Sequence, residues 1–385
     1  MASYDFLIVG AGIVGAAIAY RLAPHGRVAI LEKEAQPGYH ATGRSTATFV
    51  ESYGGQAAHL LTVASRGFLE SPPAGFCDGA LLARRGNLRF ARPGQREQLA
   101  QTLAACGPRI PDLAIISQQD ALALCPPLRP ELVDCALYEP RAADMDVHAI
   151  HQGYLRAARA QGADIYTETP LEHIERRAEG HPGRRQDARH WRIHAKDRVI
   201  EARWLINAAG AWADNIARLA GVRPLGITPK RRTVVTFTPP AGGAIDHWPL
   251  VRDADESFYF KPFGGDILLT PADETPLAPC DAQPEEIDIA IALARMQAAT
   301  GIAPSHLASR WAGLRSFTRD ERPAIGRAAD EPYFFWAAGL GGYGIQTSPA
   351  IGFMTAHLLA DAPLPTAVEA DLTALIPDLA PARFS

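Results

Sequence analysis

Apolar residues in the first thirty positions form two short runs separated by a helical pattern. Residues 6–9 and 28–31 are continuous apolar stretches, and apolar residues recur at helical spacing between them as far as residue 22. Short, fully apolar runs joined by a helix are typical of parallel strands that are buried on both faces. The N-terminal pattern therefore predicts a strand–helix–strand unit.

Three glycines stand in the first turn of this unit with the spacing of a dinucleotide-binding fingerprint. Gly10 permits the tight turn, Gly12 lets a pyrophosphate approach the backbone, and Gly15 lets the helix pack on the strand. The helix N-terminus offers N–H groups to phosphates, and Glu32 can accept hydrogen bonds from a ribose. This pattern alone does not distinguish NAD from FAD.

The middle and the end of the chain carry similar units. Residues 204–221 have the pattern of strand, small-residue turn and helix, and a strand at 333–338 precedes a second glycine cluster. A closing helix is expected at 349–359, with Ser348 as its cap and Pro349 as its first residue. The other predicted elements are strands at 81–90, 163–167, 234–237, 257–261 and 266–270, and helices at 60–68, 96–105, 118–124, 148–161 and 284–299, with a polar loop at 38–55.

This interleaving predicts an α/β fold with two domains. The Rossmann-like nucleotide-binding domain is assembled from discontinuous segments, and an α+β substrate domain built on an antiparallel sheet is inserted between them. We assign residues 1–80, 141–222 and 312–385 to the first domain and residues 81–140 and 223–311 to the second. Because NAD dehydrogenases normally keep the nucleotide domain contiguous, this arrangement favours FAD.

Composition excludes several functional classes. A net charge of −4 gives no reason to expect nucleic acid as a partner. The basic stretch 176–203 is interpreted as a solvated hairpin, with a binding patch as the alternative. Five scattered cysteines without C-x-x-C favour free thiols in a reducing compartment, and no histidine pattern predicts a metal site. No apolar run is long enough to span a membrane. We expect a cytoplasmic protein, with peripheral membrane contact left open.

Several motifs, in order along the chain, carry a family resemblance. The N-terminal fingerprint, GYHATGRS at 38–45, LINAAGAW at 205–212, WAGLRSFTRDERPAIG at 311–326 and GGYGIQTS at 341–348 together resemble the D-amino-acid oxidase superfamily of FAD enzymes. Within it, the likeness is closest to bacterial FAD-dependent D-arginine dehydrogenases and similar D-amino-acid dehydrogenases. The resemblance covers essentially the whole chain.

The resemblance implies which residues contact FAD. The ADP half is assigned to Gly10, Gly12, Gly15 and Glu32, the stretch between phosphates and flavin to Thr42, Gly43, Arg44 and Ser45, and a second close approach to Ala208, Ala209 and Gly210. The flavin is assigned to Gly339, Gly341, Gly342, Gly344, Ile345, Gln346 and Thr347, and Ile13, Lys33, Trp212, Gly313 and Tyr343 complete the set. For the C-terminal glycine cluster, a connection without any ligand is the alternative.

The resemblance also implies a substrate site for an amino acid. It assigns Arg232 and Arg315, helped by Tyr53 and Tyr259, to the carboxylate, and Gln346 and the Gly342 carbonyl to the amine. A guanidinium matches a carboxylate with two parallel hydrogen bonds. For Arg232, a solvated basic turn with Lys230 and Arg231 is the alternative. The implied reaction is hydride transfer from Cα to flavin N5, giving an imino acid that hydrolyses to a 2-oxo acid and ammonia.

Three positions depart from D-arginine dehydrogenases in the expected side-chain pocket. Asn87 replaces a glutamate that would pair with a basic substrate, Thr48 replaces a histidine, and Val50 replaces a hydroxyl-bearing residue. We therefore expect a D-2-amino acid with a neutral or apolar side chain. An exposed loop at position 87 is the alternative.

Two further departures concern the flavin. Leu269 stands where sarcosine-type oxidases carry a lysine near flavin N5, and residues 313–326 lack the cysteine to which those oxidases attach FAD. We therefore expect non-covalent FAD, poor oxygen reactivity, and a quinone or another carrier as electron acceptor.

These observations predict an FAD-dependent D-amino-acid dehydrogenase, with an oxidase less favoured. One alternative is an enzyme of the same fold that acts on a secondary amine such as sarcosine, on glycine or on a 2-hydroxy acid. The other is an FAD-binding subunit that is not itself an enzyme.

Overall fold

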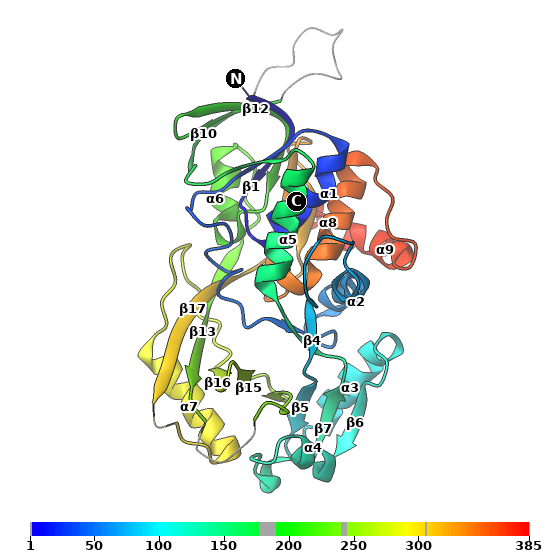
Figure 1. Ribbon diagram of the computed structural model, residues 1–385, viewed down its shortest axis with the longest axis vertical. Coiled ribbons are helices and arrows are strands. Elements are labelled where there is room, and N and C mark those ends of the chain that lie inside the picture. Colours follow the sequence, from blue (N-terminus) through cyan, green and yellow to red (C-terminus); the bar gives the residue numbers. More distant parts are fainter. Residues whose placement is uncertain (1, 177–189, 240–244, 305, 385) are drawn as a thin grey trace.

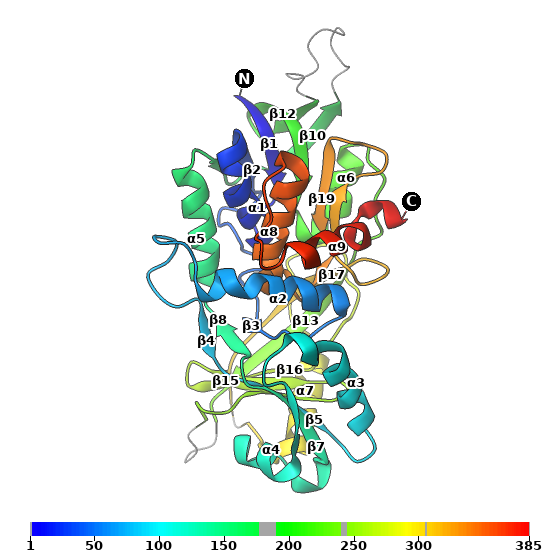
Figure 2. The same ribbon diagram turned by 90° about the vertical axis from the view of Figure 1, so that its right-hand side faces the viewer.

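Two large β-sheets, one above the other in Figure 1, form the frame of the molecule. The structure is a computed structural model that describes residues 2–176, 190–239, 245–304 and 306–384. A small third sheet lies between the large ones (Figure 2) and consists of β3 (Thr48–Phe49), β8 (Ala143–Met145) and β4 (Leu82–Arg84).

The upper sheet has the strand order β10-β11-β12-β1-β2-β9, and β19 also pairs with β12 and β18 with β19. Its centre is parallel, and the pairs β10–β11, β11–β12 and β18–β19 are antiparallel. Its strands are β1 (Ala2–Val9), β2 (Val28–Leu31), β9 (Asp164–Tyr166), β10 (Leu171–Arg176), β11 (Trp191–Ala195), β12 (Arg198–Asn207), β18 (Ala324–Arg327) and β19 (Phe334–Ala338).

Helices cover both faces of the upper sheet. One apolar core lies between the sheet and α1 (Ile13–Leu22), α2 (Gln56–Glu70), α5 (Val147–Ala160), α8 (Gly344–Ala360) and α9 (Glu369–Leu379). The opposite core includes α6 (Ala213–Leu219) and the antiparallel strands. Burial on both faces explains why β1 and β2 end in continuous apolar runs.

The lower sheet has the strand order β20-β17-β13-β16-β15-β14-β5-β7-β6. Its strands are β5 (Asn87–Ala91), β6 (Ala114–Ser117), β7 (Cys135–Glu139), β13 (Thr228–Phe237), β14 (Leu250–Asp253), β15 (Tyr259–Phe263), β16 (Asp266–Thr270), β17 (Leu307–Phe317) and β20 (Leu340–Gly341). Its outer layer contains α3 (Arg96–Cys106), α4 (Gln118–Leu124) and α7 (Glu286–Thr300). The long strands β13 and β17 rise from this sheet toward the upper one (Figure 1).

This architecture confirms the predicted fold class, because discontinuous segments build a Rossmann-like sheet and a second, mainly antiparallel sheet is inserted between them. One pair in the lower sheet, β14 with β5, is parallel. The residue limits proposed for the two domains stay a prediction.

Most predicted elements are present, with three corrections. The strand expected at 81–90 is two strands in different sheets, β4 and β5, and the loop expected at 38–55 contains β3. The basic stretch 176–203 contains β11 and part of β12, and β11 pairs with β12 as a hairpin, while residues 177–189 lie outside the described part of the chain. The closing helix, α8, begins at Gly344 and contains Pro349.

The early start of α8 has a local explanation. Ser348 does not cap the helix; its Oγ donates a hydrogen bond of 2.9 Å to the carbonyl oxygen of Ile345. This is the carbonyl that a helical N–H at position 349 would bond, and proline has no N–H. The serine hydroxyl replaces that donor, so the helix accommodates Pro349.

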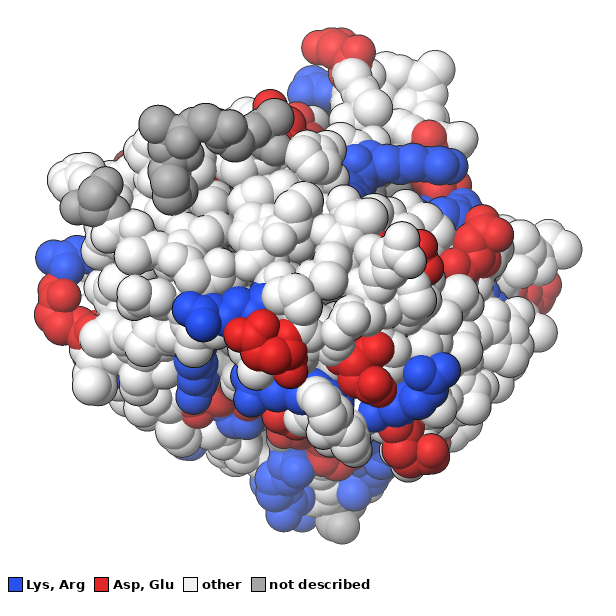
Figure 3. Space-filling view, turned by 90° about the horizontal axis from the view of Figure 1, so that it is seen from below, with Lys and Arg blue, Asp and Glu red and all other residues white. Residues whose placement is uncertain are grey.

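Charges of both signs lie side by side on the face seen from below in Figure 3. Such mixing gives no extended surface of one sign in this view. In the part of the chain that the structure describes, no helix is long and apolar enough to cross a membrane.

Candidate active site

A cavity of about 710 Å³ lies between the two large sheets and has both glycine clusters in its wall. One end contains Glu32, after β2, and the other contains Arg232 and Arg315, on β13 and β17. The volume is in the upper part of the range for small-molecule and cofactor sites.

The N-terminal glycines shape the first end of the cavity. Gly10 has φ +101°, and a Cβ at Gly15 would lie 1.9 Å from the Gly10 carbonyl oxygen, so both glycines are needed for α1 to approach β1. A Cβ at Gly12, by contrast, would meet only Thr42 Oγ1, at 3.4 Å. Packing within the protein therefore does not require a glycine at position 12, and the cavity beside the N-terminus of α1 is open at this residue.

Two side chains are held in fixed positions at the same end. Glu32 is buried, and its carboxylate accepts hydrogen bonds from the backbone N–H groups of Ala11, at 2.9 Å, and Glu34, at 3.0 Å. Lys33 Nζ lies 3.5 Å from the ring centroid of Trp212. All three predicted residues, Glu32, Lys33 and Trp212, line the cavity, so a carboxylate and an ammonium group flank the place predicted for a nucleotide.

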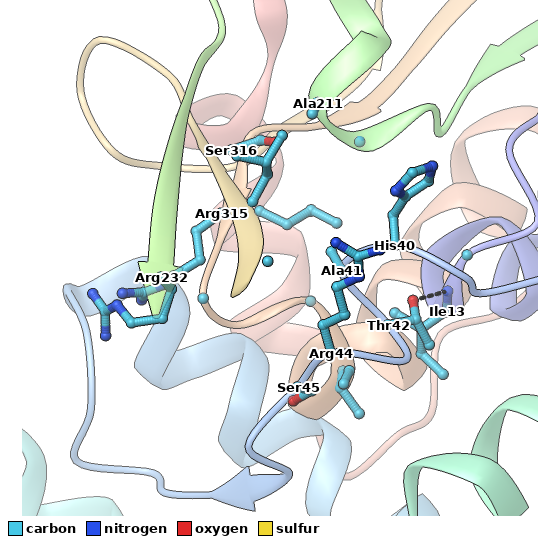
Figure 4. Close-up of a pocket in the computed structure, with 18 of the residues that line it drawn as sticks. Ile13, His40, Ala41, Thr42, Arg44, Ser45, Ala211, Arg232, Arg315 and Ser316 are labelled. Atoms are coloured by element: carbon cyan, nitrogen blue, oxygen red, sulfur yellow. Dashed lines mark hydrogen bonds between the residues drawn. The ribbon is translucent and has the colours of Figure 1, made fainter. Parts of the chain in front are cut away.

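The loop after β2 joins the cavity wall to the lower sheet. Thr42 Oγ1 accepts a hydrogen bond of 3.0 Å from the N–H of Ile13 at the start of α1 (Figure 4). Arg44 donates to the carbonyl oxygens of Ala282 and Ala312 at 3.0 and 3.1 Å and forms an ion pair with Asp281. The Arg44 guanidinium is therefore occupied by the protein, and its role is to hold the loop.

The second glycine cluster lies at the other end of the cavity, before and within the first turn of α8. Gly339 and Gly341 have φ of +69° and +53°, in the left-handed region that favours glycine. A Cβ at Gly342 would lie 1.9 Å from Arg315 Nη2. The cluster therefore serves two purposes, because it turns the chain into α8 and leaves room for the Arg315 guanidinium.

Arg315 and Arg232 extend from adjacent strands toward the same end of the cavity (Figure 4). Their side chains are only 12% and 10% exposed. Arg315 Nη2 donates to the Tyr53 hydroxyl at 3.0 Å. The carboxylate of Glu274 accepts from Arg315 Nη1 at 3.3 Å and from Arg232 Nη2 at 3.2 Å. A carboxylate of this chain thus lies between the two guanidinium groups.

The charges at this end shift the titration of nearby groups. Burial raises the pKa of Tyr53, but the positive charges of Arg315 and Arg232 outweigh it, and the pKa lies below its usual value. Burial likewise opposes ionisation of Glu274, yet its hydrogen bond from Lys230 and the charge of Arg315 hold its pKa below the usual range. Burial lowers the pKa of Arg315, but its interactions with the hydroxyl groups of Tyr53, Tyr343 and Tyr259 outweigh burial and raise the pKa, so Arg315 stays charged.

Most of the residues predicted from the sequence line this cavity. The lining includes Gly10, Gly12, Ile13, Glu32, Lys33, Thr42, Arg44, Ser45, Thr48, Val50, Tyr53, Ala208, Ala209, Gly210, Trp212, Arg232, Tyr259, Gly313, Arg315, Gly339, Gly341, Gly342, Gly344, Ile345 and Gln346. Gly15, Gly43, Tyr343 and Thr347 do not line it. Gly15 packs against Gly10, Gly43 packs against Gly38, and the Tyr343 ring contacts that of Tyr53.

Three sequence-based expectations need correction. Asn87 is 1% exposed on β5, so the exposed-loop interpretation is wrong, and it does not itself line the cavity. The Gln346 amide bonds the Val50 backbone and Thr62 Oγ1, which leaves it committed to the protein instead of a substrate amine. Leu269 packs in the apolar core of the lower sheet, so its identity says nothing about a group beside the flavin.

Sequence reasoning missed several residues in the cavity wall: Leu250, Arg252, Asp255, Glu256, Phe258, Glu274 and Cys280. Arg252 had a usable signal, because it follows the apolar pair Leu250 and Val251 just as Arg315 follows apolar residues. Within the described residues, no group of three or more His, Cys, Asp or Glu side chains is placed to hold a metal ion.

Known proteins are similar to this chain in sequence and in fold. The chain is 26% identical to glycine oxidase from Geobacillus kaustophilus, covering 92% of this chain and 93% of that one. It is 25% identical to mouse mitochondrial sarcosine dehydrogenase, over 92% of this chain but only 39% of the length of that relative. The crystal structure of L-proline dehydrogenase from P. horikoshii has a TM-score of 0.83 at 20% identity and covers 100% of this chain and 98% of that one.

The family assignment follows from the match over most of the chain. The sequence model of the family described as FAD dependent oxidoreductase, DAO, matches residues 5–358. The chain therefore belongs to the DAO family of FAD-dependent oxidoreductases.

Proposed function

We propose that this protein oxidises the bond between Cα and nitrogen in a small amino carboxylate, with D-2-amino acids as the first candidates. The observation that carries the proposal is the pair of buried arginines, Arg315 and Arg232, at the opposite end of one cavity from the nucleotide-binding glycines. A charged guanidinium is expensive to bury unless it meets an anion. A substrate carboxylate is the small anion that an amino acid always presents.

The residues present fit FAD at the upper end and along the middle of the cavity. A Cβ built at Gly12 would meet no protein atom closer than 3.4 Å, and Gly12 lines the cavity at the N-terminus of α1. Glu32 would bind the ribose of the adenosine, and Thr42 and Ser45 would lie along the phosphates and the ring system. At the lower end, Gly344 and Ile345 at the N-terminus of α8 would face the flavin.

The chain itself binds and orients the substrate. Arg315 and Arg232 would hold the carboxylate with charge-assisted hydrogen bonds, and the hydroxyl of Tyr53, 3.0 Å from Arg315 Nη2, would add a third donor. Glu274 occupies the space between the two arginines, so substrate binding requires Glu274 to give up these contacts. Fixing the carboxylate at this end directs Cα toward the middle of the cavity.

When bound, FAD supplies the acceptor for the two electrons that leave Cα as hydride. The substrate nitrogen must lose a proton to solvent before oxidation, because only a neutral amine has the electron pair that forms the C=N bond. The substrate that reacts is therefore the neutral amine. Addition of water to C=N then gives a 2-oxo acid and releases ammonia. No side chain of the cavity wall therefore has to act as a strong base in this reaction.

A second candidate substrate class is glycine or an N-substituted glycine. Two relatives favour it: one, matched over most of both chains, is named a glycine oxidase, and another, matched over 39% of its own length, is named a sarcosine dehydrogenase. The same arginine pair would serve these substrates, since they share the carboxylate and the adjacent C–N bond.

The cofactor linkage and the electron acceptor are part of the proposal. We propose non-covalent FAD, because residues 313–326 lack a cysteine. We also propose a quinone or another carrier as electron acceptor, which the relative named a sarcosine dehydrogenase supports. Cys280 is in the cavity wall, so the linkage needs a direct test. Acid precipitation of the purified protein should release all of the flavin into the supernatant, and flavin retained by the pellet would contradict non-covalent binding.

Anaerobic titration tests the function. Purified, FAD-loaded protein is mixed with D-amino acids, L-amino acids, glycine, sarcosine and 2-hydroxy acids, and the visible flavin absorbance is followed. Loss of absorbance with D-amino acids supports the first candidate, and loss with glycine or sarcosine alone supports the second. If no amino carboxylate bleaches the flavin, the proposed function is wrong.

A further inference from the structure

Arg252 is a third arginine at the substrate end of the cavity, beside Arg232 and Arg315. It lies on β14, and its side chain is 4% exposed. Leu250, two residues earlier, also lines the cavity, as expected for the same face of a strand. The register partner of Arg252 on β15 is Tyr259, which lines the cavity as well. The strand pairing therefore directs Arg252 to the substrate end.

The hydrogen-bonding capacity of Arg252 is largely unused. Its Nη1 donates to Glu256 Oε1 at 3.2 Å. Its Nε and Nη2, both buried, have no hydrogen-bond partner among the described residues. A buried polar donor without a partner is costly, and a charged one more so, which is why most are satisfied by protein, water or ligand. Arg252 is thus a buried cation with an acceptor for only one of its three nitrogens among the described residues.

The position of Arg252 places it close to the predicted carboxylate site. The Arg252 guanidinium carbon lies 4.9 Å from the centroid of the Tyr53 ring, and the Arg315 guanidinium carbon lies 6.0 Å from the same centroid. Both guanidinium groups therefore lie beside the same tyrosine ring. A ligand that reaches both would carry two anionic groups joined by a short linker.

The acids of this region do not replace a ligand for Arg252. Glu256 and Glu274 have side chains that are 38% and 40% exposed, against 4% for Arg252. Asp255 is exposed and accepts a hydrogen bond from Gln95 Nε2. The acids that line the cavity at this end thus lie toward solvent and the arginines lie inside. The buried Asp253, next to Arg252, does not line the cavity and accepts hydrogen bonds from the N–H and hydroxyl of Ser257. The inner wall of this end is therefore cationic.

We propose that the substrate is a small amino dicarboxylate and that Arg252 binds its second carboxylate. This inference rests on the proposed function, because it adds a second anionic group to the same substrate. The first carboxylate lies at Arg315 and Arg232, the C–N bond lies toward the flavin, and the second carboxylate accepts hydrogen bonds from Nε and Nη2 of Arg252. It replaces the expectation of a neutral or apolar side chain, which was drawn from Thr48, Val50 and Asn87.

The second carboxylate has two chemical sources, and matched pairs of compounds distinguish them. D-glutamate against D-glutamine, and D-aspartate against D-asparagine, test a carboxylate on the carbon side chain. N-carboxymethylglycine against sarcosine tests a carboxylate on the nitrogen substituent. Each pair keeps the first carboxylate and the reacting C–N bond and changes the charge of the far end. In at least one pair, we expect the dicarboxylate to bleach the flavin at least 10-fold more efficiently than the monocarboxylate. Efficiency is the rate constant of bleaching divided by the apparent dissociation constant.

Two variants locate the effect. Arg252→Gln removes the charge at the proposed site. Arg89→Gln is the control, because Arg89 is the register partner of Arg252 on β5, also pairs with Glu256 at 3.8 Å, and does not line the cavity. We expect Arg252→Gln to lower the efficiency with the dicarboxylate by about 10- to 100-fold while changing the matched monocarboxylate by less than about 3-fold. Arg89→Gln should leave the ratio within each pair unchanged.

A binding measurement gives a readout that does not depend on turnover. Glutarate and succinate contain two carboxylates and no oxidisable C–N bond, and butyrate contains one carboxylate. Calorimetric titration of the FAD-loaded protein should show tighter binding of a dicarboxylate than of butyrate in the wild type, with the preference lost in Arg252→Gln. Circular dichroism and flavin content establish that each variant is folded and loaded.

The outcomes separate this inference from the proposed function. If monocarboxylates bleach the wild-type flavin as well as dicarboxylates in every pair, the inference is wrong and the proposed function stands. The wild-type pairs decide this even if Arg252→Gln fails to fold. A preference for dicarboxylates that Arg252→Gln leaves intact would also overturn the assignment to Arg252. If no amino carboxylate reacts, the proposed function itself fails.

Discussion

A single methyl group at position 342 tests the carboxylate-binding end of the cavity. A Cβ there would lie 1.9 Å from Nη2, 2.3 Å from Nε and 2.4 Å from Cζ of Arg315. Gly342 does not have the left-handed φ that a side chain would strain. Gly342→Ala therefore acts through the Arg315 guanidinium, which it displaces without changing its charge.

The magnitude follows from the contacts that this displacement breaks. To reach ordinary van der Waals separation, the guanidinium must move by roughly 1.5 Å. Such a movement breaks the 3.0 Å hydrogen bond to Tyr53 and the 3.3 Å contact with Glu274, and it misaligns the donors for a substrate carboxylate. A hydrogen bond to a charged group contributes about 1.5–3 kcal/mol. The dissociation constant of a carboxylate ligand should therefore rise by roughly 10- to 150-fold.

The assay is titration of a non-oxidisable carboxylate into FAD-loaded protein, followed by the visible flavin spectrum. Gly342→Ala, Arg315→Ala and the double variant form a thermodynamic cycle. Gly67→Ala is the control, because Gly67 lies within α2 and a Cβ there meets nothing within 4 Å; it should stabilise the helix by about 1 kcal/mol and leave binding unchanged. If Gly342→Ala weakens binding as much in the Arg315→Ala background as in the wild type, the methyl group does not act through Arg315 and the reasoning is refuted.

Three further predictions concern the same cavity. Glu274→Gln removes the carboxylate that competes for the arginine pair, so calorimetry should show a carboxylate ligand binding about 3- to 10-fold more tightly, and weaker binding would contradict the competition. Gly15→Ala places Cβ 1.9 Å from a backbone oxygen and should lower the melting temperature of both apo and FAD-loaded protein. Gly12→Ala should instead lower the flavin content, measured by the ratio of visible to ultraviolet absorbance, and change the stability of the apo protein by less than about 1 kcal/mol. Equal melting temperatures for the two variants would refute this distinction. Because the pKa of Tyr53 is lowered, its phenol ionises below the usual pH, and the neutral donor becomes an anion that repels a carboxylate. Carboxylate binding should therefore weaken as pH rises through that pKa, by up to about 10-fold per pH unit, and the dependence should disappear in Tyr53→Phe, as titration across the alkaline range would show.

The nucleotide end of the site could be predicted from the sequence because its determinants are local. The strand, the turn at Gly10, the helix and Glu32 all lie within residues 2–32, and the close approach of Gly15 to Gly10 is a contact within that segment. A pattern of short range is preserved in the chain whatever the rest of the molecule does. The helix boundary at Gly344 was missed for an equally local reason, because the Ser348 hydroxyl substitutes for the N–H that Pro349 lacks.

The substrate end could be predicted only in part, because sheet pairing assembles it. Asn87 and Leu250 are register partners on parallel strands, although more than 160 positions separate them in the sequence. No periodicity in either segment indicates that pairing. The expectation for the side-chain pocket therefore used positions 48, 50 and 87 and could not include Arg252, which enters through β14. Residue types could be identified from the sequence, but their neighbours required the sheet register.

The three arginines at the substrate end, Arg232, Arg252 and Arg315, share a physical requirement that links the fold to specificity. Each lies on a strand of the lower sheet, and burial of a guanidinium demands an anion nearby. For Arg232 and Arg315 the carboxylate of Glu274 meets that demand, and a substrate carboxylate would replace it. For Arg252 the contact with Glu256 leaves two of its three nitrogens without acceptors among the described residues. Among the three, Arg252 has the fewest acceptors from the protein. We therefore expect Arg252 to discriminate most strongly between substrates, because a ligand without a second anionic group would leave two of its buried nitrogens without a hydrogen bond.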